Sequence, residues 1–301
     1  MPSTSSPKQV DRQVDRARPL LGTLVAVRVS GLAEAEANSL IDAAFAEIAD
    51  IHRLMSFHEP DSDLSRLNRT AATRAVEVDT RTHEVVSRAV EFAAASAGAF
   101  DPTVAGQLVK WGFLPAAHLG RAPDAKASWR DIELLEGGRI RFHRPLWIDL
   151  GGIAKGYAVD RAIDGMRRRA GGHYLVNAGG DLRVSGPGSE RVFLRLPTPS
   201  PDQMIPAIEV ENGSIASSSG REHMRTVRRM KVGPHVHARR RRPMGLRTFV
   251  SVVSERCVVA DALTKIVLAN GMRSTGILRK YQATAYLHNA RHGWRTLGIG
   301  A

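Results

Sequence analysis

Residues 147–162, WIDLGGIAKGYAVDRA, carry the most informative local pattern in the chain. A short apolar segment leads through Asp149 into the pair Gly151-Gly152, and a helical pattern beginning near Lys155 follows. Glycines allow the backbone to approach a ligand closely, and the N-terminus of a helix attracts phosphate. The segment therefore predicts a strand–loop–helix unit that binds an anion. The plain alternative is a tight connection with a surface lysine, because neither nucleotide-binding glycine motif is present.

On either side of this segment, strand and helix patterns alternate without a regular repeat. Apolar residues in 34–55 recur three and four positions apart, which predicts a long amphipathic helix. We expect one α+β domain over residues 18–301, with mixed or antiparallel sheets and packed helices, after a disordered lead at 1–17. The other expected elements are strands at 24–29, 146–150, 174–178, 248–254 and 282–287, helices at 82–97, 155–169 and from about 259, a loop at 57–69 and an irregular stretch at 98–147.

The composition is that of a globular protein. Of 301 residues, 43% are hydrophobic and 24% are charged, which excludes disordered and collagenous chains. The single Cys257 excludes an intramolecular disulfide and a cysteine-rich metal site. No apolar stretch approaches the roughly 18–20 residues that span a bilayer, and neither a signal peptide nor a lipobox is seen, so we expect a cytoplasmic protein without a membrane segment.

The charge is strongly basic, because 43 Lys and Arg residues exceed 30 Asp and Glu residues by 13. Such an excess favours anionic partners, although a solvated arginine-rich surface explains it equally well. Residues 239–242 form a run of four arginines. Single-strand or RNA binding usually also needs aromatic side chains among the basic ones, and none lies between 225 and 242. Nucleic-acid binding is therefore the weaker alternative, and no nucleic-acid partner is expected.

Two further segments combine glycine turns with chemistry-bearing side chains. In HYLVNAGGDLRVSG (173–186), a strand runs into Gly179, Gly180 and Asp181, which suits ligand contact or an ordinary hairpin turn. In GAFDPTVAGQLVKWGF (98–113), aromatic residues follow a loop and could form the flat apolar wall that a flavin or purine needs, or belong to the core.

A third segment, CVVADALTKIVLANG (257–271), reads as an apolar helix with Asp261 near its start. Asp261, Thr264 and Lys265 share one helical face. A carboxylate and a hydroxyl form a hard oxygen pair suited to Mg²⁺. Alternatively, Asp261 is a charge that favours the helix dipole.

In this order, the segments resemble the ApbE family of FAD:protein FMN transferases. The resemblance begins at LLGT (20–23), continues through MSFHEPDSDLSRLN (55–68) and the segments above, and includes SSG (218–220) and ADALTK (260–265). It spans about residues 18–271 and implies a single ApbE-like, T-fold-like domain.

The resemblance implies a Mg²⁺-dependent transferase, with Mn²⁺ as the alternative ion. Such an enzyme takes FAD as its substrate, moves FMN to a Thr or Ser hydroxyl of an acceptor flavoprotein and releases AMP. This is phosphoryl transfer, in which positioning and charge neutralisation dominate catalysis.

The family's site residues can be placed on this sequence by the resemblance. Its metal ligands correspond to Asp261 and the backbone carbonyl of Gly152, and His235 is the candidate that helps to deprotonate the acceptor hydroxyl. The implied FAD contacts are Leu21, His58, Ala99, Phe100, Asp101, Asp149 and Lys155, with Gly179, Gly180 and Asp181 lining the same cleft.

The chain departs from the family pattern at three places. Lys265 stands where the family usually has Thr, so either the Thr264 hydroxyl turns to the metal or the Lys265 ammonium replaces part of the cation's charge. His58 stands where Tyr is common, and HVHARRRRPMG (235–245) replaces a stretch that usually contains Asp-Pro-Arg-Thr-Gly. The second hypothesis is therefore an FAD-binding protein or FAD pyrophosphatase with a degenerate metal site.

Overall fold

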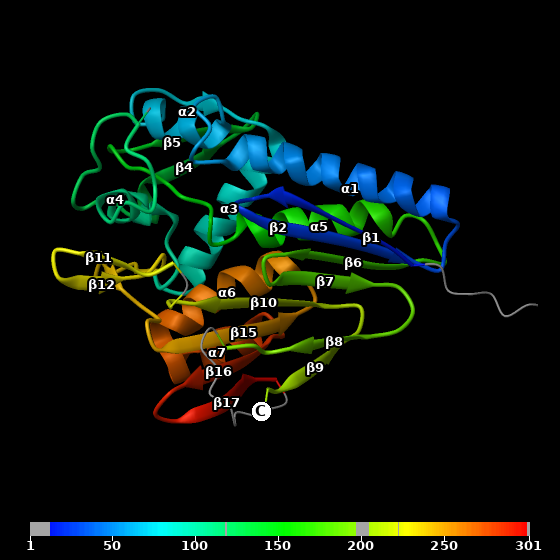
Figure 1. Cartoon of the computed structure of the whole chain (residues 1–301). Helices are drawn as coiled ribbons and strands as arrows, with labels where there is room; N and C mark the ends of the chain where they lie inside the picture. Colours follow the sequence, from blue (N-terminus) through cyan, green and yellow to red (C-terminus); the bar gives the residue numbers. More distant parts are fainter. Residues whose placement is uncertain (1–12, 118, 197–204, 222, 300–301) are drawn as a thin grey trace, which may run out of the picture.

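The computed structural model describes residues 13–117, 119–196, 205–221 and 223–299. Within them, an eight-stranded sheet has the order β1-β2-β6-β7-β10-β15-β16-β17, and every neighbouring pair is antiparallel (Figure 1). Its strands are β1 (Gln13–Leu20), β2 (Thr23–Ser30), β6 (His173–Ala178), β7 (Asp181–Ser185), β10 (Ser214–Ser219), β15 (Thr248–Ser254), β16 (Thr284–Asn289) and β17 (Gly293–Gly298).

Three helices pack on one face of this sheet. Helix α1 (Glu34–Met55) contacts β1 and β2, α5 (Ala154–Met166) contacts β6 and β7, and α6 (Cys257–Asn270) contacts β10 and β15. Side chains alternate between the two faces of a strand, so every second residue of β2 points to the helices. Val25, Val27 and Val29 are accordingly all fully buried in the core shared with the helices. The next strand is buried on both faces, because Val176 joins this core while Leu175 joins a second cluster beneath β8 (Glu190–Phe193) and β9 (Ala207–Val210).

Helices α5 and α6 touch each other through a glycine. A Cβ atom at Gly156 would lie 2.4 Å from the carbonyl oxygen of Cys257, so only glycine permits this approach. The buried carboxylate of Asp160 on α5 accepts hydrogen bonds from the backbone N–H groups of Cys257 and Val258, which fixes the start of α6. This crossing sets the position of Asp261, one turn further along α6.

A smaller unit lies at the upper left of Figure 1, beside one end of α1, and contributes residues to the site. It contains α2 (Asp63–Thr70), α3 (Thr80–Ala95), α4 (Ala105–Lys110) and the three-stranded sheet β3-β5-β4, with β3 (Val76–Glu77), β5 (Arg139–Phe142) and β4 (Ile132–Leu135).

The remaining elements are short. They are β11 (Arg225–Val227), β12 (Met230–Val232), β13 (Val236–His237), β14 (Arg242–Pro243), α7 (Thr275–Lys280) and the 3-10 turns η1 (Pro102–Val104), η2 (Trp129–Asp131) and η3 (Gly271–Ser274).

The predicted α+β class with packed helices and antiparallel sheets is confirmed. The helix at 34–55 and the strand at 248–254 have the predicted bounds. Two predictions are wrong, because residues 13–17 of the expected disordered lead belong to β1 and the expected loop at 57–69 contains α2. Strand β17 was not predicted. The rest of that lead, residues 1–12, lies outside the described residues.

The expected strand at 146–150 is also absent from the described sheets. The side chain of Asn68 takes the place of a neighbouring strand, because its amide bonds both the N–H of Ile148 (2.8 Å) and the carbonyl of Ile148 (2.9 Å). The N–H of Asp149 then donates to the carbonyl of Pro102 at 2.8 Å. These hydrogen bonds position Asp149 at the edge of the site, although its segment is not paired with a neighbouring strand.

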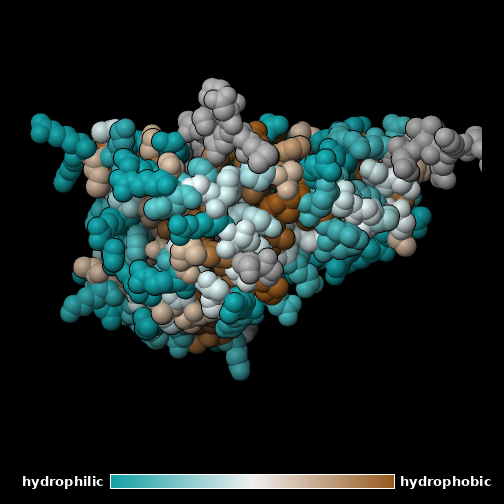
Figure 2. All heavy atoms as spheres, turned by 90° about the horizontal axis from the view of Figure 1, so that it is seen from below, coloured by the Kyte–Doolittle hydropathy of each residue, from teal (hydrophilic) through white to brown (hydrophobic). Residues whose placement is uncertain are grey.

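Hydrophilic side chains dominate the face shown in Figure 2, and hydrophobic ones are confined to small areas between them. Among the described residues, no helix combines the length and the apolar character that crossing a membrane requires.

Candidate active site

A cavity of about 480 Å³ lies between the smaller unit and the ends of the sheet strands. Its walls come from five parts of the chain: α4 with the loops before and after it, the Gly151-Gly152 turn with the start of α5, the β6–β7 turn, the end of β10 with the segment after it, and α6. The principal lining residues are Ala99, Phe100, Asp101, Val104, Phe113, Leu114, Asp149, Gly152, Lys155, Gly179, Ser217, Ser218, His223, Arg225, His235, Met244 and Lys265.

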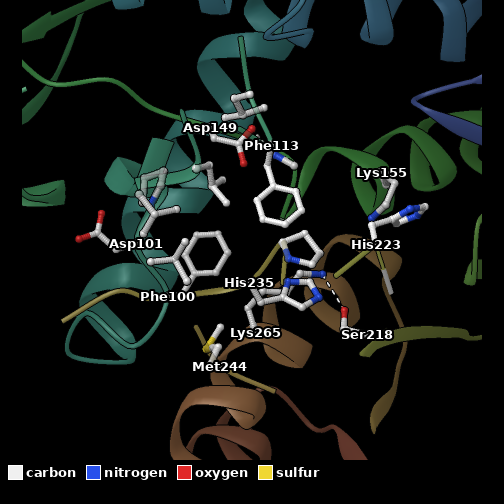
Figure 3. Close-up of a pocket in the computed structure, with 18 of the residues that line it drawn as sticks. Phe100, Asp101, Phe113, Asp149, Lys155, Ser218, His223, His235, Met244 and Lys265 are labelled. Atoms are coloured by element: carbon white, nitrogen blue, oxygen red, sulfur yellow. Dashed lines mark hydrogen bonds between the residues drawn. The ribbon is translucent and has the colours of Figure 1, made fainter. Parts of the chain in front are cut away.

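One wall of the cavity is apolar and aromatic. The rings of Phe100 and Phe113 lie next to each other in Figure 3, with Met244 below them. Phe100 is held by an edge-to-face contact with Phe92, at 6.3 Å between ring centroids. Gly152 leaves room for this ring, since a Cβ atom there would lie 3.3 Å from Phe100 Cε2. Such a wall suits the flat face of a heteroaromatic ligand.

Two lysines form a charged end of the cavity, which adjoins the aromatic wall, because a Cβ atom at Gly152 would lie 3.3 Å from Phe100 Cε2 and 3.6 Å from Lys265 Cε. The ammonium of Lys155 lies 2.5 Å from Oδ2 of Asp181 and 3.6 Å from Oδ2 of Asp261. The ammonium of Lys265 contacts Oδ1 of Asp261 and donates to Oγ of Ser218 at 3.0 Å. The two carboxylates are buried, with side-chain exposures of 1% and 0%, whereas both lysines line the cavity. The ammonium groups therefore separate the carboxylates from the ligand space.

The pKa shifts follow from this arrangement. Burial disfavours the charged form of Lys155, but the carboxylates of Asp181 and Asp261 outweigh that effect and raise its pKa. Burial likewise opposes ionisation of Asp261, but Lys155 and Lys265 outweigh it and lower the pKa of Asp261. Burial and the neighbouring charge of Asp261 raise the pKa of Asp181 to about 6. Asp261 thus interacts with both cations, while Lys155 is hydrogen-bonded to Asp181.

His235 lies beside Lys265 in the cavity (Figure 3). Burial and the positive charges of Lys265 and Lys155 lower the pKa of His235 to about 3. Its imidazole is therefore neutral near pH 7 and able to accept a proton. The carboxyl group of Asp149 also faces the cavity, and burial raises its pKa.

The described side chains do not fit the Mg²⁺ site that the family resemblance implied. Both carboxylate oxygens of Asp261 are engaged, Oδ1 by Lys265 and Oδ2 by the N–H of Gly156 at 3.2 Å. The Thr264 hydroxyl donates to the backbone carbonyl of Asp261 (2.7 Å) and pairs with Ser218 (2.9 Å) instead of turning toward that carboxylate. In the part of the chain that the structure describes, no group of three or more His, Cys, Asp or Glu is placed to hold a metal ion.

Most of the predicted site residues are brought together by the fold. Those that line the cavity are Ala99, Phe100, Asp101, Asp149, Gly152, Lys155, Gly179 and His235, and Asp181 and Asp261 lie directly behind the lysines. Asp101 is oriented differently from the expectation, because its carboxylate accepts two hydrogen bonds from Thr103 and points away from the rings (Figure 3).

Three predicted contacts do not line this cavity: Leu21, His58 and Gly180. Leu21 occupies the β1–β2 turn at a φ of 56° and packs on the core. His58 is exposed in the turn after α1, and the N–H of Gly180 closes a turn onto the side chain of Asn177.

In the segment 223–244, the sequence indicated His235 as a site residue but not His223, Arg225 or Met244. His223, Arg225 and Met244 line the cavity, and Arg225 stacks on the Phe113 ring at 4.8 Å. Their only sequence signal was the proximity of the SSG segment and His235. The arginine run is partly the solvated surface that was expected, since Arg239, Arg240 and Arg242 are exposed. Arg239 and the half-buried Arg241 also donate to the backbone carbonyls of Ala97 and Thr103.

An aromatic wall and two lysines in one cavity suit a ligand with a flat ring and phosphate groups. The chain belongs to the ApbE family, whose model matches residues 21–287. It is 28% identical over 276 residues to the FAD:protein FMN transferase of Vibrio cholerae, covering 86% of this chain and 82% of that protein. It is 31% identical over 216 residues to the protein of the same name from Klebsiella pneumoniae, covering 66% of this chain and 61% of the relative.

Solved structures show the same fold. The ApbE protein of Thermotoga maritima superposes with a TM-score of 0.82 at 24% identity, covering 94% of this chain and 96% of that one. The flavin transferase ApbE of Vibrio cholerae superposes with a TM-score of 0.78 at 24% identity, covering 95% and 96% of the two chains.

Proposed function

We propose that this protein is an FAD:protein FMN transferase. The observation that carries the proposal is the cavity, which is lined both by the aromatic side chains of Phe100 and Phe113 and by Lys155 and Lys265, within a chain of the ApbE family. FAD has the matching chemistry, since it joins a flat isoalloxazine ring to a pyrophosphate. The relatives named above support the same activity by their names.

In this proposal, the isoalloxazine ring packs on the aromatic wall and the pyrophosphate lies at the charged end. Lys155 and Lys265 neutralise charge on the phosphate oxygens as it develops. Their positions are held by Asp181 and Asp261, so little reorganisation is needed when the ligand binds. The Gly151-Gly152 turn permits the close approach of the ligand.

The chemical step is a displacement at phosphorus. The Thr or Ser oxygen of the acceptor flavoprotein bonds to the phosphorus of the FMN half, the bond from that phosphorus to the bridging oxygen breaks, and AMP leaves with the bridging oxygen. His235 accepts the proton of the hydroxyl. Its low pKa makes it a weak base in the free protein, and the negative pyrophosphate raises that pKa on binding.

A protein that only binds FAD, or hydrolyses it with water as the acceptor, is the second candidate. The contact of Lys265 with Asp261 favours it, because the expected metal ligand is already engaged. Nucleic-acid binding finds less support, since two of the four consecutive arginines are directed at backbone carbonyls of the protein itself.

The test is to incubate the purified chain with FAD and a threonine-containing acceptor peptide, with Mg²⁺ or with EDTA, and to follow AMP, FMN and peptide mass by chromatography and mass spectrometry. A flavin-labelled peptide with equimolar AMP is the expected result. AMP and free FMN without labelled peptide indicates a pyrophosphatase, and bound FAD without AMP indicates a binding protein. Fractionation of the producing cells tests the expected cytoplasmic location.

A further inference from the structure

The charged end of the cavity contains two cation–anion pairs rather than a cluster of acidic groups. Together, Lys155, Lys265, Asp181 and Asp261, the charged quartet, have a formal charge of zero. The arrangement bears on how the diphosphate of a ligand is bound, and the inference below rests on the proposed function.

A divalent cation would have to compete with Lys265 for Asp261. The Lys265 ammonium contacts Oδ1 of Asp261, and its side chain is only 10% exposed. Displacing it would leave a buried ammonium without its carboxylate, which is strongly unfavourable. The quartet also offers no net negative charge to attract a dication.

The same geometry presents positive charge to the cavity. An ammonium has three N–H donors, and two of those on Lys265 are directed to Asp261 and Ser218. Both lysines reach the cavity lining while their carboxylates stay behind them. The pKa of His235 agrees with this placement, because burial lowers it and the charges of Lys265 and Lys155 lower it further, against the opposing charge of Asp261.

We infer that Lys265, together with Lys155, takes the place of a divalent cation on Asp261, so that this protein binds the diphosphate group of its ligand without a metal ion. Ser218 is a positioning residue, since it holds the Lys265 ammonium at the cavity floor.

The test is calorimetric titration of the full chain with FAD and, separately, with ADP, in EDTA and in excess Mg²⁺. The expected dissociation constants are the same in both buffers within about twofold. Lys265→Met keeps the length of the side chain and removes its charge, and is expected to weaken both ligands by about ten- to a hundredfold. Lys126→Met is the matched control, because Lys126 is exposed and lies outside the cavity.

If Lys265→Met fails to fold, the double variant Lys265→Met/Asp261→Asn takes its place, because it removes both members of the pair and leaves no unpaired charge. Binding of FAD that requires Mg²⁺, or that Lys265→Met leaves unchanged, overturns the inference while the proposed function stands. Binding of ADP without FAD supports the metal-free diphosphate site and overturns the flavin assignment. Failure of both ligands in both buffers overturns the two together.

Discussion

The ammonium of Lys265 lies on the carboxylate of Asp261, one turn earlier on α6. Asp261 in turn accepts the N–H of Gly156 and faces Lys155 at 3.6 Å, so one buried carboxylate joins two helices and two cations. The helix crossing and the charge of the ligand site therefore depend on the same group, and the predictions below separate its structural and functional roles.

Substituting Asp261 by Asn should be strongly destabilising. The change leaves the Lys265 ammonium buried without its partner, and removing one member of a buried pair costs about 3–5 kcal/mol. The measurement is urea denaturation followed by circular dichroism. Asp42→Asn is the control, because its ion pair with Arg18 is exposed and contributes at most about 1 kcal/mol. Similar losses in the two variants would contradict the structural role of the pair.

Lys265→Thr should make flavin transfer respond to Mg²⁺. The substitution removes the ammonium from Asp261 and supplies a hydroxyl on the same helical face. The carboxylate of Asp261 and this hydroxyl are oxygen ligands of the kind that Mg²⁺ prefers. We expect AMP release by the variant to rise about tenfold with Mg²⁺, against little change for the unaltered chain. Equal Mg²⁺ responses in both proteins would argue that Lys265 does not occupy the cation's position.

Gly156→Ala should separate helices α5 and α6. The new Cβ would lie 2.4 Å from the carbonyl oxygen of Cys257 and 2.9 Å from Cβ of Asp261, which costs about 1–3 kcal/mol by overpacking. Gly165→Ala in the same helix meets no atom within 4 Å and should be stabilising by up to about 1 kcal/mol. Thermal melting of the pair is the measurement, and opposite signs of the shift are expected.

Arg241→Met should loosen the segment that carries His235 and Met244. The guanidinium donates to the carbonyl of Thr103 at 2.9 Å and to that of Ala127 at 3.4 Å, so its loss costs about 1–2 kcal/mol of folding free energy. We also expect FAD binding to weaken severalfold in a fluorescence titration. Arg240→Met, at the exposed neighbouring position, is the control. Equal effects of the two variants on stability and FAD binding would show that the hydrogen bonds of Arg241 contribute nothing beyond its positive charge.

The stability of the protein should depend on His235 at mildly acidic pH. The pKa of His235 is lowered to about 3, so the unfolded chain takes up a proton below about pH 6.5 that the folded chain does not. Stability is therefore present above pH 6.5 and is lost as the pH falls. Between about pH 7 and pH 5 the loss assigned to His235 is about 1–2 kcal/mol. Urea denaturation of the protein and of His235→Gln at both pH values measures it, and parallel losses would show that the imidazole is charged in the folded state.

Several parts of the fold follow from patterns that depend only on neighbouring residues. The three- and four-residue spacing of apolar side chains predicted α1 with both of its ends, and the β-branched run of β15 predicted that strand. The prediction failed where a distant side chain intervened: Asn68 bonds the backbone of Ile148, so the apolar segment 146–150 needs no strand partner.

The sequence by itself determined which residue types would meet at the site, since the glycine turns, the aromatic segment and the Asp261 helix could all be recognised from it. Only the tertiary structure decided which charges pair. The approach of α5 to α6 at Gly156 brings Lys155 to Asp261, and the packing of α5 on β7 brings it to Asp181. Strand β10 supplies Ser218 to Lys265. Pairing of buried charges depends on distance and on exclusion of water, and both arise from the packing of segments far apart in the chain.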